Sequence, residues 1–127
     1  MRQFAFNMGA NKYKNKKVEV DGIVFDSSKE AKVYADLKVL KASGEIKDFA
    51  RQVKFELIPN QYEDIQDEKG KTKKKLVERA VTYVADFVID HNDGSKAVID
   101  VKGYPDQKYG IKRKLMRYMH GIAIQEV

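Results

Sequence analysis

Two apolar runs, Val81–Asp90 and Lys96–Gly103, are joined by the polar segment HNDGS, and this pattern constrains the fold more than any other part of the sequence. Each run has the length of one strand, and Asn, Asp and Gly between two such runs favour a β-hairpin. A three-residue loop would place Asp86 opposite Asp100, whereas a two-residue loop would place Asp86 opposite Val101. The sequence therefore predicts a hairpin whose register depends on the length of its loop.

Charged side chains occur in both predicted strands. Asp100 and Lys102 are separated by one residue, so they point to the same face of the sheet, together with Val98. Asp86 likewise interrupts an apolar run. The apolar face of this first strand is predicted to consist of Val81, Tyr83, Ala85, Phe87 and Ile89.

Two carboxylates directly opposite each other repel and lose hydration unless a cation lies between them. A divalent metal ion is the simplest such cation. The chain has no Cys and only 2 His, and a site built from oxygen ligands favours Mg²⁺ or Mn²⁺ over zinc. The alternative is structural, with an ion pair between Asp100 and Lys102 and a backbone partner for Asp86.

The remaining apolar patterns predict two helices and further strands. KVEVDGIVFDS reads as a hairpin that turns at Asp21-Gly22, and a helix follows from a cap at Ser27 or Ser28 to a stop at Gly44. QVKFELIP is a strand, and the charged stretch after it, residues 60–75, is a loop or a mobile hairpin tip. Residues 107–119 form a second helix, basic on its exposed side, and IAIQEV ends the chain as a short strand. The order helix, three strands, helix, strand predicts an α/β sandwich with a mixed sheet.

Glu30 is a third acid with an unusual position. It precedes Val33, Tyr34 and Leu37 by three, four and seven residues, so it lies on the buried stripe of the first helix. A structural role is the alternative, because a Glu in the first helical turn stabilises the helix dipole and completes a capping box with Ser27.

Length and composition favour one intracellular domain. A chain of 127 residues that is 43% hydrophobic suits a single core, with residues 1–12 as a flexible arm and 13–127 as the folded domain. The absence of Cys fits a reducing compartment, and no apolar run is long enough for a membrane span or a signal peptide.

The net charge of +6 is concentrated in two flanks. Residues 1–17 hold five cationic side chains and no acid, and residues 102–120 hold six against one acid. Such flanks suggest a polyanionic partner, with solvated surfaces as the alternative.

These residues match a family pattern. Asp86, then Asp100-Val101-Lys102 after a hairpin, with Glu30 on a preceding helix, resembles the PD-(D/E)XK nuclease superfamily. The phrases NKYKNKKVEVDGIVFDSSKEAKVYADLK, RQVKFELIP, YVADFVID and VIDVKGY look like small phage-encoded Holliday-junction-resolvase-like endonucleases. Ala85 stands where the motif usually has proline, and the second acid is Asp rather than Glu.

The resemblance implies a single-domain αβββαβ restriction-endonuclease-like core, with a central mixed sheet flanked by helices. It implies Mg²⁺ or Mn²⁺ bound by Asp86, Asp100, the carbonyl of Val101, and Glu30 directly or through water. Lys102 would orient or deprotonate the attacking water, and Gln52 would be a supporting polar residue.

The same resemblance implies a metal-dependent DNA endonuclease that acts on branched or structured DNA in phage replication or recombination, in the cytoplasm of a bacterial host. A homodimer would suit a symmetric junction. The alternatives are a non-catalytic DNA-binding module of the same fold, or a nickase or RNA-directed nuclease. Cations of the second helix would contact DNA phosphates, namely Lys108, Lys112, Arg113, Lys114 and Arg117.

Overall fold

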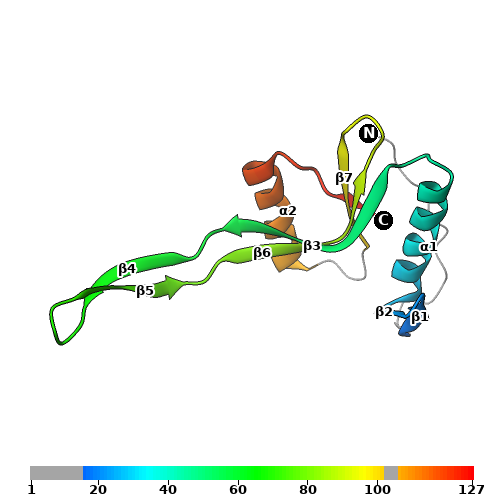
Figure 1. Cartoon of the computed structure of the whole chain (residues 1–127). Helices are drawn as coiled ribbons and strands as arrows, with labels where there is room; N and C mark the ends of the chain where they lie inside the picture. The colour runs from blue at the N-terminus through cyan, green and yellow to red at the C-terminus, as the bar shows by residue number, and fades with distance from the viewer. Residues whose placement is uncertain (1–15, 102–105) are drawn as a thin grey trace.

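The computed structural model describes residues 16–101 and 106–127. Its centre is a four-stranded mixed sheet of order β3-β6-β7-β8, in which only β8 runs parallel to its neighbour (Figure 1). Around this sheet the elements follow the predicted order helix, three strands, helix, strand. Their bounds are α1 Ser28–Ala42, β3 Asp48–Ile58, β6 Val81–Asp90, β7 Lys96–Asp100, α2 Gln107–His120 and β8 Gln125–Glu126.

The hairpin β1 (Val18–Val20) and β2 (Ile23–Phe25) precedes α1 and turns at Asp21-Gly22, as predicted. Both turn residues have positive φ, which suits the turn that matches strand twist. Ser27 caps α1 by accepting a hydrogen bond from the backbone N–H of Glu30 at 3.1 Å, and Gly44 ends the helix segment at φ +78°.

The two helices cover opposite faces of the sheet. On one face, α1 packs through side chains such as Val33 and Leu37 against Phe87 and Ile99. On the other face, Met116 of α2 is buried against residues that include Val88 and Val98. Because strand side chains alternate, β6 and β7 bury both faces and are therefore apolar almost throughout.

One prediction about β6 is wrong. Tyr83 and Ala85 do not share a core with Phe87 and Ile89, because the first two pack into the α2 cluster and the last two into the α1 cluster. Side chains of β6 change from one face of the sheet to the other at Asp86. In the β3–β6 ladder this point lies between the pair Val53–Ala85 and the pair Arg51–Phe87. Gln52 lies at the same point of β3 and has φ +52°, so regular alternation is interrupted there.

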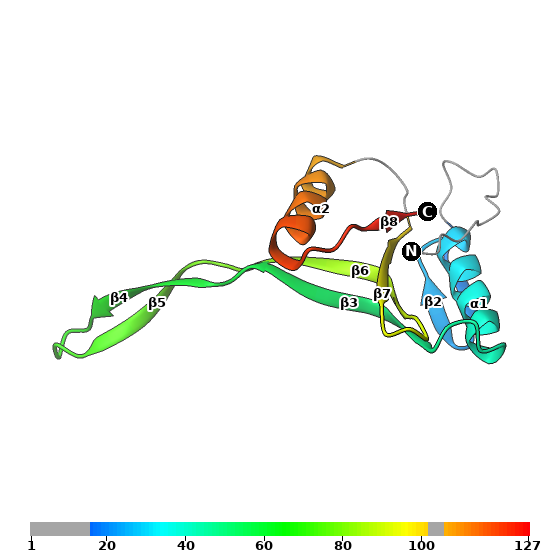
Figure 2. The same cartoon turned by 90° about the horizontal axis from the view of Figure 1, so that it is seen from above.

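The charged stretch after β3 is a hairpin rather than a loop. Strands β4 (Gln61–Gln66) and β5 (Thr72–Glu78) continue the β3–β6 ribbon outward, and every residue of both strands is exposed. Figure 2 shows this hairpin reaching away from the sheet and both helices. Pro59 has no N–H to donate to the ladder. Beside it, the N–H of Ala80, between β5 and β6, donates to the side chain of Asn60 at 2.6 Å.

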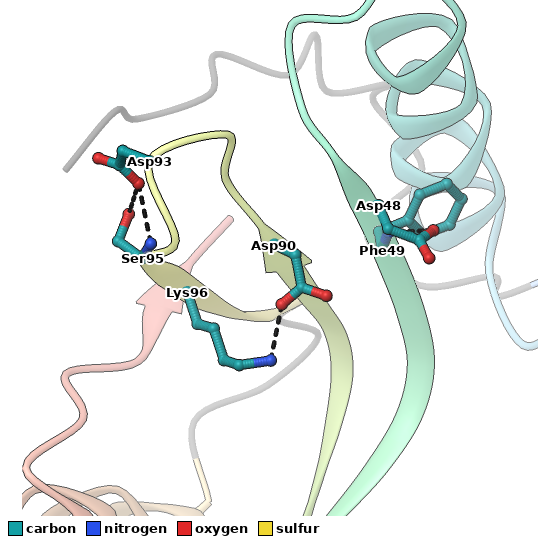
Figure 3. A network of polar contacts seen from close by, with 6 residues as sticks. All are labelled: Asp48, Phe49, Asp90, Asp93, Ser95 and Lys96. Atoms are coloured by element: carbon teal, nitrogen blue, oxygen red, sulfur yellow. Dashed lines mark hydrogen bonds and ion pairs between the residues drawn. The ribbon is translucent and has the colours of Figure 1, made fainter.

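The loop between β6 and β7 has three residues, so of the two registers considered the one that places Asp86 opposite Asp100 is formed. His91 N donates to Ser95 O at 2.9 Å, and Gly94 takes φ +88°. Asp93 accepts hydrogen bonds from the N–H and the hydroxyl of Ser95, which lower its pKa, and Lys96 bonds Asp90 at 2.7 Å (Figure 3). These contacts stabilise the pairing of Phe87 with Ile99 and so bring Asp86 and Asp100 beside each other.

No helix among residues 16–101 and 106–127 is long and apolar enough to cross a membrane. The proposed arm of residues 1–12 lies outside the described part of the chain.

Candidate active site

Asp86, in the middle of β6, and Asp100, the last residue of β7, lie beside each other. Asp100 is 7% exposed, and its carboxyl group lies within hydrogen-bonding reach of Asp86. Asp86 Oδ2 also accepts a hydrogen bond of 2.7 Å from the backbone N–H of Val101. The contact with Val101 holds the Asp86 carboxyl group at the end of β7.

Burial is the main cause that raises the pKa of Asp86 to about 7; the hydrogen bond from the Val101 N–H opposes this rise, and the charges of Asp100 and Glu30 add to it. Asp86 therefore keeps its proton to a higher pH than an ordinary Asp. A cation bound between Asp86 and Asp100 would therefore be stabilised by both carboxyl groups.

Glu30 joins this group from the first turn of α1. Its side chain is buried, and desolvation is the main cause that raises its pKa, with Asp100 contributing through its charge. The amide of Gln52 donates to Glu30 Oε1 at 3.2 Å, and Arg51 Nη2 lies 3.9 Å from the same oxygen. Ser27 caps the helix through the backbone N–H of Glu30, so this cap does not use the Glu30 carboxylate.

The unusual backbone of Gln52 explains how a strand residue reaches Glu30. With φ +52°, Gln52 departs from the strand conformation of its neighbours. Arg51 lies beside it with its guanidinium carbon 4.5 Å from the ring centre of Phe25. Both side chains thus contact Glu30 from β3; Gln52 was expected only as a supporting polar residue of the site, and Arg51 was not singled out.

The described part of the chain contains no group of three or more His, Cys, Asp or Glu side chains close enough together to hold a metal ion as they stand. Three carboxylates interact through their charges, but only Asp86 and Asp100 are in direct contact. Lys102 was expected to complete this site and lies outside the described residues. For Val101, the structure describes a hydrogen bond through its N–H rather than a role for its carbonyl.

Two tyrosines near Asp100 were not expected at this site. Tyr83 is 4% exposed, and burial and the charge of Asp100 raise the pKa of its hydroxyl. That hydroxyl has no well-formed hydrogen bond to any described residue. Tyr109 of α2 packs beside Tyr83 and donates to Glu126 Oε1 at 2.8 Å. The alternating pattern of the strand had suggested only a core role for Tyr83.

Glu126 is a further acid at this edge of the sheet. It pairs with Asp100 across the parallel strands β7 and β8, and Val127 N donates to Asp100 O at 3.0 Å. Arg113 Nη1 lies 3.5 Å from Glu126 Oε1, so this cation of α2 is directed toward the end of β7. A lone Glu near the C-terminus carries no sequence signal that would have revealed this position.

The cations of α2 do not form one uniform basic face. Lys108, Lys114 and Arg117 are exposed, Lys112 is half-buried and Arg113 is paired with Glu126. Ile111, Tyr118 and Met119 are also exposed on this helix, so apolar side chains lie among the expected cations on its outer side. Helical spacing predicts which residues of α2 share a face. It does not predict which apolar residues of α2 find a surface to pack against.

The fold and this group of acids define a mixed α/β protein in which the half-buried Asp86 of β6 lies beside the buried Asp100 at the end of β7. Residues 10–124 match the family described as "Protein of unknown function (DUF1064)", and the chain belongs to that family. Comparison with curated proteins and with solved structures yields no match.

Proposed function

We propose that this protein is a metal-dependent endonuclease of the PD-(D/E)XK type that hydrolyses phosphodiester bonds in DNA. The observation that carries the proposal is the contact of two carboxyl groups, Asp86 and Asp100, where β7 ends in the mixed sheet, with Glu30 close enough to raise the pKa of Asp86. The restriction-endonuclease-like identity of the core is part of the same proposal.

The donor set fits Mg²⁺ or Mn²⁺ in its chemistry. All three acids offer oxygen ligands, and their mutual repulsion would be relieved by a divalent cation. Asp86 and Asp100 would hold the ion, with Glu30 reaching it directly or through water and the Val101 carbonyl as a further candidate ligand. The bound ion would supply charge stabilisation for the phosphate and a more acidic water.

The side chains of this chain would perform the remaining tasks. Lys102 would orient the attacking water and offset negative charge on the phosphate in the transition state. Gln52 holds the Glu30 carboxylate by its hydrogen bond, and the Val101 N–H holds that of Asp86, so both acids are oriented before substrate arrives. Exposed Lys108, Lys114 and Arg117 would position the DNA backbone without reading sequence.

The test is cleavage of labelled four-way junction, flap, nicked and linear DNA with Mg²⁺, Mn²⁺ or EDTA. We expect metal-dependent cleavage with preference for a branched substrate, and no cleavage in EDTA. The matched variants are Asp100→Asn at the site and Asp90→Asn on the exposed end of β6, where Asp90 only pairs with Lys96. Equal activity of the two variants would remove Asp100 from the chemistry.

The main alternative is a DNA-binding module without catalysis. The presence of Asp86, Asp100 and Lys102 together argues against it, because a module that only binds has no need for a repulsive acid pair. Tight binding of junction DNA without cleavage in either metal would favour this alternative. A nickase or RNA-directed nuclease would show itself in the same panel once RNA strands are included.

A further inference from the structure

The hairpin β4–β5, residues 61–78, is a projecting arm whose strands touch little besides each other (Figures 1 and 2). Every residue of its two strands is exposed. An isolated two-stranded hairpin is at best marginally stable in water, so an arm of this kind gains order when a partner covers it.

One face of the arm combines an apolar pair with an ion pair. Tyr62 lies opposite Leu76, and these side chains are 53% and 41% exposed. Two residues further along the same face, Asp64 lies opposite Lys74 with 3.6 Å between their charged groups. We call this surface, made of Tyr62, Asp64, Lys74 and Leu76, the Tyr62 face.

The arm separates charge between its strands. Acids gather on β4 and the turn after it, whereas lysines gather from the turn onto β5, and residues 61–78 carry no net charge. A polyanion laid along the arm would meet the acidic strand as well as the basic one. The residues concerned are Glu63, Asp64, Asp67 and Glu68 on the acidic side and Lys71, Lys73, Lys74 and Lys75 on the basic side.

A second arm of the same sequence is complementary in only some arrangements. Two-fold pairing edge to edge would place β4 beside β4, or β5 beside β5, and like charges would meet. Stacking of two Tyr62 faces about a two-fold axis along the arm instead lays β4 of each copy over β5 of the other. Asp64 of each copy then lies opposite Lys74 of the other, and Tyr62 of each copy lies opposite Leu76 of the other.

We propose that the Tyr62 face is a dimerisation surface and that its partner is the Tyr62 face of a second copy of this chain. In the dimer, Tyr62 of each copy covers Leu76 of the other, and Asp64 of each copy pairs with Lys74 of the other. This inference does not depend on nuclease activity, so either can fail without the other.

The test is a charge-swap mixing experiment read by sedimentation velocity at several protein concentrations. Asp64→Lys alone and Lys74→Asp alone each place like charges across the interface, so both variants should be monomers where the wild type is a dimer. An equal mixture of the two variants should recover dimers, because each lysine of one variant then faces an aspartate of the other. Within each arm the Asp64–Lys74 pair stays broken, so recovery reports contacts between chains.

Glu63→Lys is the matched control. Glu63 lies on the same strand opposite Lys75, but its side chain points to the other face of the arm, so this variant should remain a dimer. The proposal is overturned if the wild type is a monomer at every concentration, if Glu63→Lys dissociates the dimer as Asp64→Lys does, or if the mixture stays monomeric. A monomer whose affinity for duplex DNA falls on Lys73→Gln and Lys74→Gln would instead assign the arm to nucleic acid.

Discussion

At the residue scale, Asp86 is the most informative position, because its raised pKa has a sign that experiment can check. The pKa of Asp86 is near 7 in the folded protein and has its ordinary value near 4 in the unfolded chain. Between these values the folded state holds a proton that the unfolded state has lost, so stability falls as pH rises through this window. Below this pH range the ionisation of Asp86 does not affect the free energy of unfolding. Above it, Asp86 lowers the free energy of unfolding by a constant amount.

We therefore predict that Asp86→Asn stabilises the metal-free protein at pH 8 relative to wild type, and that the difference disappears toward pH 4. Thermal melting in EDTA from pH 4 to pH 8 measures this. Asp90→Asn, on the exposed end of the same strand, should show no such trend. A variant that is less stable than wild type at pH 8 would mean that the Val101 hydrogen bond outweighs the repulsion.

Asp100→Asn should separate stability from metal binding. It also relieves repulsion, so the metal-free variant should melt no lower than wild type, while nuclease activity should fall at least about a hundredfold. A metal that binds only the folded state stabilises by about 2.7 kcal/mol at a hundredfold excess over Kd, so Mn²⁺ should raise the wild-type Tm by several degrees. The variant should gain little, and an equal rise in both proteins would make Asp100 a structural acid.

At the element scale, α2 carries the exposed cations Lys108, Lys114 and Arg117. We predict that replacing Lys108, Lys114 and Arg117 together by Gln weakens binding of all DNA sequences and lowers the slope of log K against log salt by up to about 2.7. The control is the triple replacement of Lys32, Lys38 and Lys41 by Gln on the exposed side of α1, which removes the same charge from the other helix. Equal losses would show that only net charge matters. Fluorescence anisotropy in increasing salt measures both.

Helix α1 packs on the sheet through its buried side chains. Leu37 of α1 is fully buried in the cluster with Phe87 and Ile99, so Leu37→Ala should cost about 2–5 kcal/mol of unfolding free energy. Val39 lies on the same helix but is 67% exposed, and Val39→Ala should change stability by less than about 0.5 kcal/mol. Urea denaturation of both variants tests the assignment of the α1 face, and similar costs would contradict it.

At the scale of the whole molecule, the arm of residues 61–78 lies outside the apolar core of the body, meaning the rest of the described structure. The body has two apolar clusters, one on each face of the sheet, and neither includes a residue of β4 or β5. We predict that replacing residues 61–78 by an Asn-Gly turn leaves the Tm of the dilute protein within a few degrees of wild type. A large loss of stability would show that the arm supports the β3–β6 ribbon.

The local sequence was sufficient to predict those elements whose turn and cap residues agree with their apolar pattern. Asp21-Gly22, the Ser27 cap, Gly44 and the three-residue turn before Ser95 each bias the backbone through nearest neighbours, and the structure follows them. The register of β6 and β7 follows from that turn alone, which is why the closeness of Asp86 and Asp100 was predictable. Glu30 was placed on the inner stripe by helical spacing for the same reason.

Only tertiary structure decided the rest, because it depends on which surfaces meet. The left-handed backbone of Gln52 and the change of face at Asp86 arise where β3 and β6 pass from one helix to the other. The approach of Glu126 to Asp100 requires the parallel return of β8 after α2, over a separation in sequence that no local pattern spans. The charged stretch after β3 is likewise a projecting hairpin because two strands continue outward past the last core residue, whereas its polarity alone allowed a loop.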